Sequence, residues 1–314
     1  MINVIFTDTH FGVKTNSISW LNSQLDFIYN QFIPFLKDNK PKKIRVIHLG
    51  DVFDSRSTIS TYIAKEVIKV FKEIRKECDE FIIVAGNHDY YSPESDEICS
   101  LDIFFRDLDI KILYNDFYVD GEDLFLPWYE YLNIENTSKI IKQLNIKNIY
   151  THADIISSPI PYKNINIYSG HTHIPYVKGN IRNLGSCYAL DFKDSNSPRG
   201  FYKIEDDKLY FIENERSIKF HRLYNDDILK EFNFNKNDYI ELYIKQSHFI
   251  EKDYIDKIEY LSKEYRNLWV IPCEDIINES SIEFKGYDIE SVVKESIPDE
   301  LKEKFNILMN YINK

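Results

Sequence analysis

Residues 81–89 read FIIVAGNHD, so a run of apolar side chains ends abruptly in a glycine and three polar residues. Two earlier stretches have the same form: residues 2–8 read INVIFTD and residues 44–51 read IRVIHLGD. Short apolar runs bounded by turn residues are typical of buried strands. Between them, residues 18–37 and 62–74 place apolar side chains at helical spacing. The alternation of strand and helix predicts βαβ units around a largely parallel sheet.

Shorter β-like runs follow between residues 110 and 215, and they predict a second sheet packed against the first. These runs are residues 110–113, 124–126, 148–150, 165–168, 200–204 and 208–212. With helices outside both sheets, the expected fold is an α/β protein built as a four-layer αββα sandwich.

The chain changes character near residue 220. A strand pattern at 239–245, a helical pattern at 253–265 and a strand pattern at 268–271 indicate a small α/β add-on domain. We therefore expect three parts, which are residues 1–215 as the main domain, 216–275 as the add-on domain and 276–314 as a polar linker with C-terminal helices. The two tail helices are expected at residues 288–295 and 299–313.

Net charge limits the class of partner. The chain has 314 residues, of which 51 are acidic and 39 basic, for a formal net charge of −12. This balance disfavours a protein that holds nucleic acid through a basic surface alone, although a local basic groove or bound divalent metals could still hold phosphate. The four cysteines form no C-x-x-C pair, which fits a reducing compartment. With no signal-peptide pattern and no long apolar run, we expect a soluble cytoplasmic protein that binds no membrane.

Five short polar motifs point to the chemistry. They are Asp8-Thr9-His10, Gly50-Asp51, Gly86-Asn87-His88-Asp89, His152 and Gly170-His171-Thr172-His173. Each is weak alone, because a single histidine is most often structural and a strand-end aspartate is often a helix cap. Each nevertheless follows a predicted strand, and ligands of open α/β sheets bind at the carboxyl ends of strands.

Carboxylates, an amide and imidazoles are ligands that divalent cations take in proteins. The spacing of Asp8 and His10 points both side chains the same way, and Asp51 is the best placed to bridge two ions. Two ions about 3.5–4 Å apart can clamp a phosphate, activate a water and neutralise charge on the leaving oxygen. The motifs therefore predict a two-metal site.

The five motifs in series resemble the calcineurin-like metallophosphoesterase superfamily, over roughly residues 1–205. The resemblance implies that one metal is held by Asp8, His10, Asp51 and His173, and the other by Asp51, Asn87, His152 and His171. It also implies that His88 is not a ligand but stabilises the transition state or protonates the leaving oxygen, and that Asp89 orients His88.

Further segments resemble the SbcD-type DNA repair nucleases, and especially their phage branch. These segments are Phe11-Gly12-Val13, residues 50–56 (GDVFDSR), Leu184-Gly185-Ser186 and residues 198–201 (PRGF). Two positions depart from the family. Asp54 stands where the cellular branch has a histidine, although the phage branch also has aspartate there, and Cys187 stands where the family often has proline.

This closer resemblance implies a DNA exonuclease or endonuclease that uses two Mn²⁺ ions, or Mg²⁺ less effectively, in recombination and double-strand-break repair. It implies a capping domain, a homodimer formed through about 18–37 and 58–76, and a partner that is an SbcC-like coiled-coil ABC ATPase on which the C-terminal helices dock. The chain has no Walker A pattern, so ATP hydrolysis would belong to that partner. If the chain is viral, its compartment is the host cytoplasm.

Other residues have both a functional and a structural interpretation. Arg56 and Arg199 could meet phosphate or form salt bridges, and Tyr90 and Tyr91 could contact a base or sugar. His48, His221 and His248 favour structural roles, and Trp20, Trp128 and Trp269 are most simply core or interface aromatics. Two other functions stay open, namely a phosphatase or phosphodiesterase acting on a non-DNA substrate, and a catalytically idle scaffold for the ATPase.

Overall fold

The computed structural model describes residues 1–92, 95–128, 139, 141–153, 164–194, 197–231 and 233–273. The linker and the two helices expected in residues 276–314 lie outside these described residues. None of the helices in the described part of the chain is long and apolar enough to span a lipid bilayer.

The first sheet has six strands in the order β14-β13-β1-β2-β3-β6. Its strands are β1 (Ile2–Phe6), β2 (Ile44–His48), β3 (Glu80–Val84), β6 (Lys111–Leu113), β13 (Gly200–Glu205) and β14 (Lys208–Glu213). The first four are parallel, as predicted, while β13 runs antiparallel to β1 and β14 antiparallel to β13.

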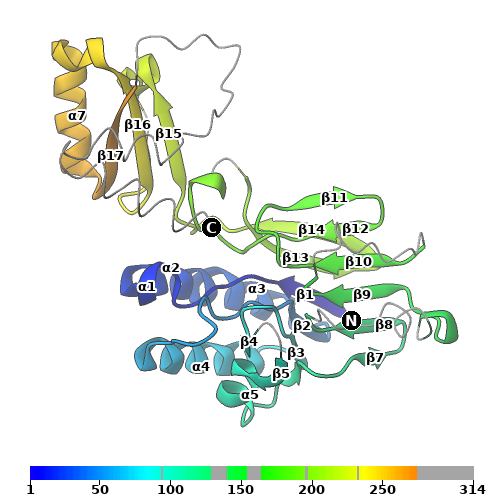
Figure 1. Ribbon diagram of the computed structural model, residues 1–314. Coiled ribbons are helices and arrows are strands. Elements are labelled where there is room, and N and C mark those ends of the chain that lie inside the picture. Colours follow the sequence, from blue (N-terminus) through cyan, green and yellow to red (C-terminus); the bar gives the residue numbers. More distant parts are fainter. Residues whose placement is uncertain are drawn as a thin grey trace, which may run out of the picture.

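Helices cover the outer face of this sheet (Figure 1). They are α2 (Ile18–Phe27), a π-helical turn (Ile28–Phe32), α3 (Ile33–Asn39), α4 (Thr61–Lys76) and α5 (Ser100–Phe105). The sequence predicted the helices at 18–37 and 62–74 but not α5, the one-turn α1 (Val13–Asn16) or the hairpin of β4 (Tyr90–Ser92) and β5 (Ser95–Cys99). Side chains alternate along β1, so Val4 and Phe6 pack against the helices and Ile5 packs against the second sheet.

The second sheet has the order β11-β12-β10-β9-β8-β7. Its strands are β7 (Tyr118–Asp120), β8 (Asp123–Leu126), β9 (Asn148–Thr151), β10 (Asn166–Ser169), β11 (Tyr176–Lys178) and β12 (Ile181–Asn183). Between the sheets, the stacked rings of Phe125, Tyr150 and Tyr168 meet Ile5 and Ile47 of the first sheet. The far face packs against Ile141 and Ile146, so the predicted αββα sandwich is confirmed.

Three runs that were expected in the second sheet lie in the first instead. Residues 110–113, 200–204 and 208–212 correspond to β6, β13 and β14. The reason is that β1 and β3 offer open edges, and β13 and β6 pair with them. An apolar run predicts a strand, but it does not indicate which edge that strand will join.

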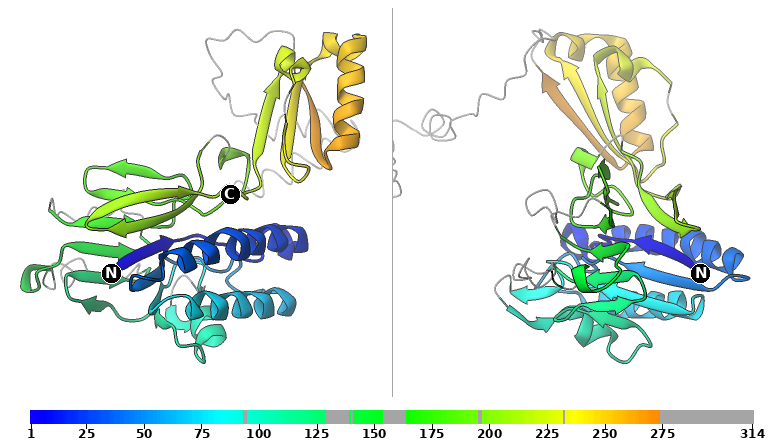
Figure 2. Two further views of the ribbon diagram at one scale, coloured as in Figure 1. Left: turned by 180° about the vertical axis from the view of Figure 1, so that it is seen from behind. Right: turned by 90° about the vertical axis from the view of Figure 1, so that its right-hand side faces the viewer.

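A small third sheet contains β15 (Phe220–Tyr224), β16 (Tyr239–Lys245) and β17 (Asn267–Cys273), all parallel. The helix α7 (Lys252–Glu264) packs on one face over Ile240, Leu242 and Ile244. Figures 1 and 2 show this capping sheet above the two larger sheets. The sequence predicted β16, α7 and β17 but missed β15, and the domain boundary at residue 216 stays a prediction.

The side chain of Arg45 joins the two large sheets at the end where β2, β3 and β8 begin. It is 3% exposed, and it contacts Glu80 of β3 (Nε to Oε2, 2.6 Å), Asp123 of β8 (3.0 Å) and Asp120 of β7. The guanidinium is buried while its three carboxylate partners are partly exposed, and removing it would leave their charges without a cation.

We expect Arg45→Met to lower the free energy of unfolding by about 3 kcal/mol, because three carboxylates would lose their shared cation. Urea unfolding measures this change. The control is Arg106→Ala, which breaks an exposed i,i+4 pair with Asp102 and should change the free energy of unfolding far less. Equal effects of the two substitutions would contradict the structural role of Arg45.

Candidate functional site

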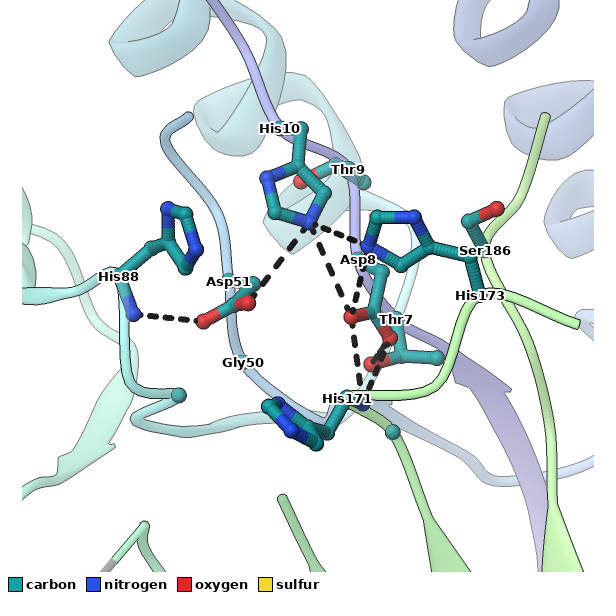
Figure 3. A network of polar contacts seen from close by, with 12 residues as sticks. Thr7, Asp8, Thr9, His10, Gly50, Asp51, His88, His171, His173 and Ser186 are labelled. Carbon is teal, nitrogen blue, oxygen red and sulfur yellow. Dashed lines mark hydrogen bonds and ion pairs between the residues drawn. The ribbon is translucent and has the colours of Figure 1, made fainter. Parts of the chain in front are cut away.

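The five polar motifs meet at the carboxyl ends of the strands. Asp8 and His10 follow β1, Asp51 follows β2, and Asn87, His88 and Asp89 follow β3; His152 follows β9 and His171 and His173 follow β10. Because the carboxyl ends of these strands from both sheets open on the same side, side chains from segments far apart in the chain point toward one another in a single cluster (Figure 3).

The ligand-type side chains form two groups, in each of which three ligand atoms lie within 4.8 Å of one another. One group is Asp8, His10 and His173, and the other is Asp51, His152 and His171. His10 joins them, because its Nε2 lies 3.7 Å from Asp51 Oδ2 and 3.1 Å from His173 Nε2. The amide oxygen of Asn87 completes the second group at 3.2 Å from His152 Nε2 and 2.9 Å from His171 Nδ1. All seven predicted metal residues therefore lie together, while their assignment to individual ions stays a prediction.

The donor set fits divalent cations. His152 donates from Nδ1 to the carbonyl of Leu49 (2.5 Å), so Nε2, which lies 3.3 Å from Asp51 Oδ2, is the ring nitrogen left to bind a metal. Asp8 and Asp51 are 0% and 2% exposed, and in the described part of the chain their ion pairs involve only histidines, never lysine or arginine. Buried carboxylates that no lysine or arginine neutralises favour the binding of positive charge.

Electrostatics support the same conclusion. Burial alone would lower the pKa of His10, but the carboxylates of Asp54, Asp8 and Asp51 outweigh burial and raise that pKa to about 10. Burial also opposes ionisation of Asp51, yet the charges of His152 and His10 hold its pKa below the usual range. The site therefore stabilises a cation among ionised carboxylates.

Backbone conformation at the candidate ligands is unusual. Asp8, His10, Asp51 and His171 all have positive φ, at 52°, 41°, 54° and 78°. Gly50 has φ 90°, and a Cβ there would lie 2.4 Å from the backbone nitrogen of Gly86. No other residue type fits this close approach. Left-handed residues concentrate at sites where the surrounding structure holds them in place.

Asp89 supports the loops and does not orient His88 as expected. Its Oδ2 accepts hydrogen bonds from the backbone N–H groups of Asp51 (2.9 Å) and Gly86 (2.8 Å), and its Oδ1 accepts one from Val52 (3.0 Å). Burial, and then the nearby charge of Asp51, raise the pKa of Asp89 to about 7. The prediction is corrected because Asp89 is fully buried and both of its oxygens face backbone amides.

A different residue holds His88. Its Nδ1 lies 2.5 Å from the carbonyl oxygen of Asp54, which therefore accepts the Nδ1 proton and leaves Nε2 for other partners. Its backbone N–H donates to Asp51 Oδ1 (2.8 Å), and its ring packs against His10 with centroids 5.1 Å apart. The Asp54 carboxylate lies 3.4 Å from His10 Nδ1. Asp54 thus contacts both His10 and His88.

Trp128 lies at the site although the sequence did not predict this, with its ring centroid 4.8 Å from that of His171 and 6.0 Å from that of His152. Trp128 follows the end of β8, and its backbone N–H donates to the carbonyl of Ala85 after β3 (2.7 Å). Its position after a predicted strand is the same feature that located the polar motifs. An aromatic residue at that position was interpreted as a core or interface residue and not as part of the site.

The remaining predicted contacts divide. Arg56 is half-buried and makes no hydrogen bond or ion pair to the described residues, so it stays a candidate for phosphate. Arg199 is 4% exposed and pairs with Asp194 (3.0 Å), which confirms the salt-bridge interpretation. The contact predicted for Tyr90 is wrong, because its side chain is buried in the core and its hydroxyl donates to the carbonyl of Tyr114 (2.5 Å). Tyr91 is 61% exposed.

Comparison with known proteins identifies the family. The family described as "Calcineurin-like phosphoesterase" matches residues 4–244. The chain belongs to the calcineurin-like phosphoesterase family. This phosphoesterase is similar to "Exonuclease subunit 1" of Enterobacteria phage T4, with 25% identity over 233 residues; the match covers 66% of this chain and 66% of that protein, just under two thirds of its length. A crystal structure of a protein of unknown function from Aquifex aeolicus matches 53% of this chain and 87% of its own, with 18% identity and a TM-score of 0.27.

His48 lies beneath the phosphoesterase site in a structural role, as expected. The N–H of Gly50 donates to its Nδ1 (3.0 Å), so its Nε2–H donates to Thr9 Oγ1 (3.0 Å). Its side chain is fully buried, and burial lowers its pKa to about 3.

We expect acid to destabilise the metal-free protein through His48. Between pH 6.5 and 3 the unfolded chain binds a proton at this residue and the folded chain does not, so the free energy of unfolding falls as the pH falls. From pH 7 to pH 5 the loss is on the order of 2 kcal/mol. Urea unfolding of His48→Gln at both pH values should show a smaller loss than the wild type. An identical pH dependence would contradict this account.

Proposed function

We propose that this phosphoesterase is a metal-dependent DNA nuclease that hydrolyses phosphodiester bonds. The observation that carries the proposal is the pair of ligand groups around Asp51 with His88 beside them. The similarity to a phage protein named as an exonuclease subunit supports a nuclease, and the resemblance of the motifs to DNA repair nucleases makes DNA the proposed substrate.

The proposed ligands of one metal are Asp8, His10, Asp51 and His173, and those of the other are Asp51, Asn87, His152 and His171. Four imidazoles favour a transition-metal cation such as Mn²⁺ over Mg²⁺, which keeps more strictly to oxygen ligands. When bound, such ions polarise the phosphoryl oxygens and lower the pKa of water.

His88 is the proposed general acid. The Asp54 carbonyl accepts its Nδ1 proton, so the ring is fixed and Nε2 is left to carry a proton to the leaving oxygen. Arg56, without an anionic partner among the described residues, is the proposed contact for a DNA phosphate.

The proposed assembly follows from charge and from the relative. A net charge of −12 makes weak DNA binding by this chain alone the expected behaviour. The relative is named as a subunit, which supports a complex. We propose an SbcC-like coiled-coil ABC ATPase as the partner, a homodimer through α2, α3 and α4, and a role in recombination and double-strand-break repair in the cytoplasm, or in the host cytoplasm if the chain is viral. Residues 276–314 are proposed to dock on the ATPase.

We expect the chelator-stripped protein to bind two Mn²⁺ ions in isothermal titration. His173→Ala should lower the affinity for one ion and His171→Ala the affinity for the other, each by about tenfold or more, because each substitution removes a ligand from a different group. His248→Ala, which removes a histidine paired with Glu251 in the capping part, is the matched control and should bind both ions normally. If both variants lowered the affinity for the same ion, the assignment of His173 and His171 to two separate groups would be contradicted.

The decisive assay measures cleavage of end-labelled linear single- and double-stranded DNA with Mn²⁺, with and without the candidate ATPase. His88→Ala should cut at least about 100-fold more slowly with Mn²⁺ affinity unchanged, since it removes a proton donor and no ligand. His248→Ala should cut normally. Hydrolysis of simple phosphomonoesters without DNA cleavage would indicate a phosphatase, and metal binding without either activity would indicate a scaffold.

A further inference from the structure

Thr9 lies between the candidate ligands Asp8 and His10, and its side chain is fully buried. Both neighbours have left-handed backbone, with φ of 52° and 41°. Such a conformation costs on the order of 1 kcal/mol or more for a residue with a side chain, so it persists only where other groups hold it. The peptide of Thr9 therefore needs neighbouring groups that hold it in place.

Two buried side chains donate to the carbonyl oxygen of Thr9. Gln24 of α2 donates from Nε2 at 2.7 Å, and Tyr188 donates from its hydroxyl at 2.9 Å. Gln24 Nε2 also lies 3.4 Å from the carbonyl oxygen of His10. These side chains are 1% and 3% exposed, and they come from segments more than 160 residues apart. They therefore fix one peptide from two independent parts of the fold.

The loop that carries Tyr188 contacts the metal-ligand stretch a second time. The thiol of Cys187 donates to the carbonyl of Thr7 (3.3 Å), two residues before the carbonyl that Tyr188 contacts. The stretch from Thr7 to Thr9 is thus held along its length by the loop of Cys187 and Tyr188, while Gln24 reaches it from α2.

We propose that Gln24 and Tyr188 are positioning residues, which fix the Thr9 carbonyl and thereby aim the side chains of Asp8 and His10 at the metal. This inference rests on the metal centre of the proposed function and not on the choice of substrate. Neither residue touches a metal or a substrate; each acts through the backbone between two ligands.

The chemistry of Gln24 argues against a purely structural role. Its Oε1 is buried and has no hydrogen-bond partner in the described part of the chain. An unsatisfied buried acceptor is unfavourable, and an apolar side chain of similar size would avoid that cost. The amide donors, directed at the carbonyls of Thr9 and His10, account for a polar residue at this position.

The experiment compares Gln24→Leu and Tyr188→Phe with the wild type in Mn²⁺ titration calorimetry and Mn²⁺ electron paramagnetic resonance. Gln24→Leu should lower the affinity for one Mn²⁺ ion about tenfold, which is typical when a group that supports a metal ligand is lost. Tyr188→Phe should lower the affinity for the same ion by a smaller factor. Thermal unfolding of the metal-free variants should stay close to the wild type, and activity should recover at saturating Mn²⁺.

Gln31→Leu is the matched control. Gln31 follows α2 in the same helical stretch and also bonds backbone, but at Glu213 and Glu215, away from the site. This variant should bind Mn²⁺ as the wild type does. If Gln24→Leu does not fold, Tyr188→Phe carries the test, because it removes only a hydroxyl and keeps the ring.

Wild-type affinity in both variants would overturn the proposal, and so would a loss that Gln31→Leu reproduces. A wild-type protein that binds no Mn²⁺ would overturn the metal centre and this proposal together. A wild type that binds Mn²⁺ but does not cut DNA would overturn only the choice of substrate, and the positioning role would still be decided by the affinities.

Discussion

Two buried carboxylates, Asp8 and Asp51, impose the constraint on which the rest of the structure depends. Burying ionised carboxylates is costly unless hydrogen bonds and positive charge compensate. The hydroxyl of Thr7 and the backbone N–H of His171 donate to Asp8, and the N–H of His88 donates to Asp51. These donors leave the negative charge in place, which the surrounding imidazoles and bound cations can offset.

The backbone around the site meets that constraint through supports that are not ligands. Asp89 holds the loops after β2 and β3 together by accepting three N–H groups, and the close approach of Gly50 and Gly86 depends on the same contact. The loop after β1 is held in turn by the loop after β2, since Asp8 N–H donates to the carbonyl of Gly50 and His10 N–H to that of Asp51. The loops after β1, β2 and β3 are therefore joined by hydrogen bonds into one connected unit.

This connectivity explains what the sequence could predict. The strands and the polar residues at their ends follow from local patterns, so Asp8, Asp51 and Asn87 were located without coordinates. The partner of His88 could not be located in this way, because a hydrogen bond to the backbone carbonyl of Asp54 does not depend on the type of side chain there. The family resemblance implied Asp89, the next residue along the chain, instead. Tyr90 was misplaced for a related reason: two adjacent tyrosines in β4 point to opposite faces, and only the fold decides which one enters the core.

The helix α2 extends the same connected unit to the capping sheet. Gln24 reaches the loop after β1, and Trp20, one turn earlier on the same face, donates its indole N–H to the hydroxyl of Tyr239 in β16 (3.0 Å) and packs on Phe220 of β15. Both side chains are buried, so neither can move without displacing its partner. A single helix therefore carries one buried contact to the capping sheet and another to the carbonyl of Thr9, which lies between Asp8 and His10.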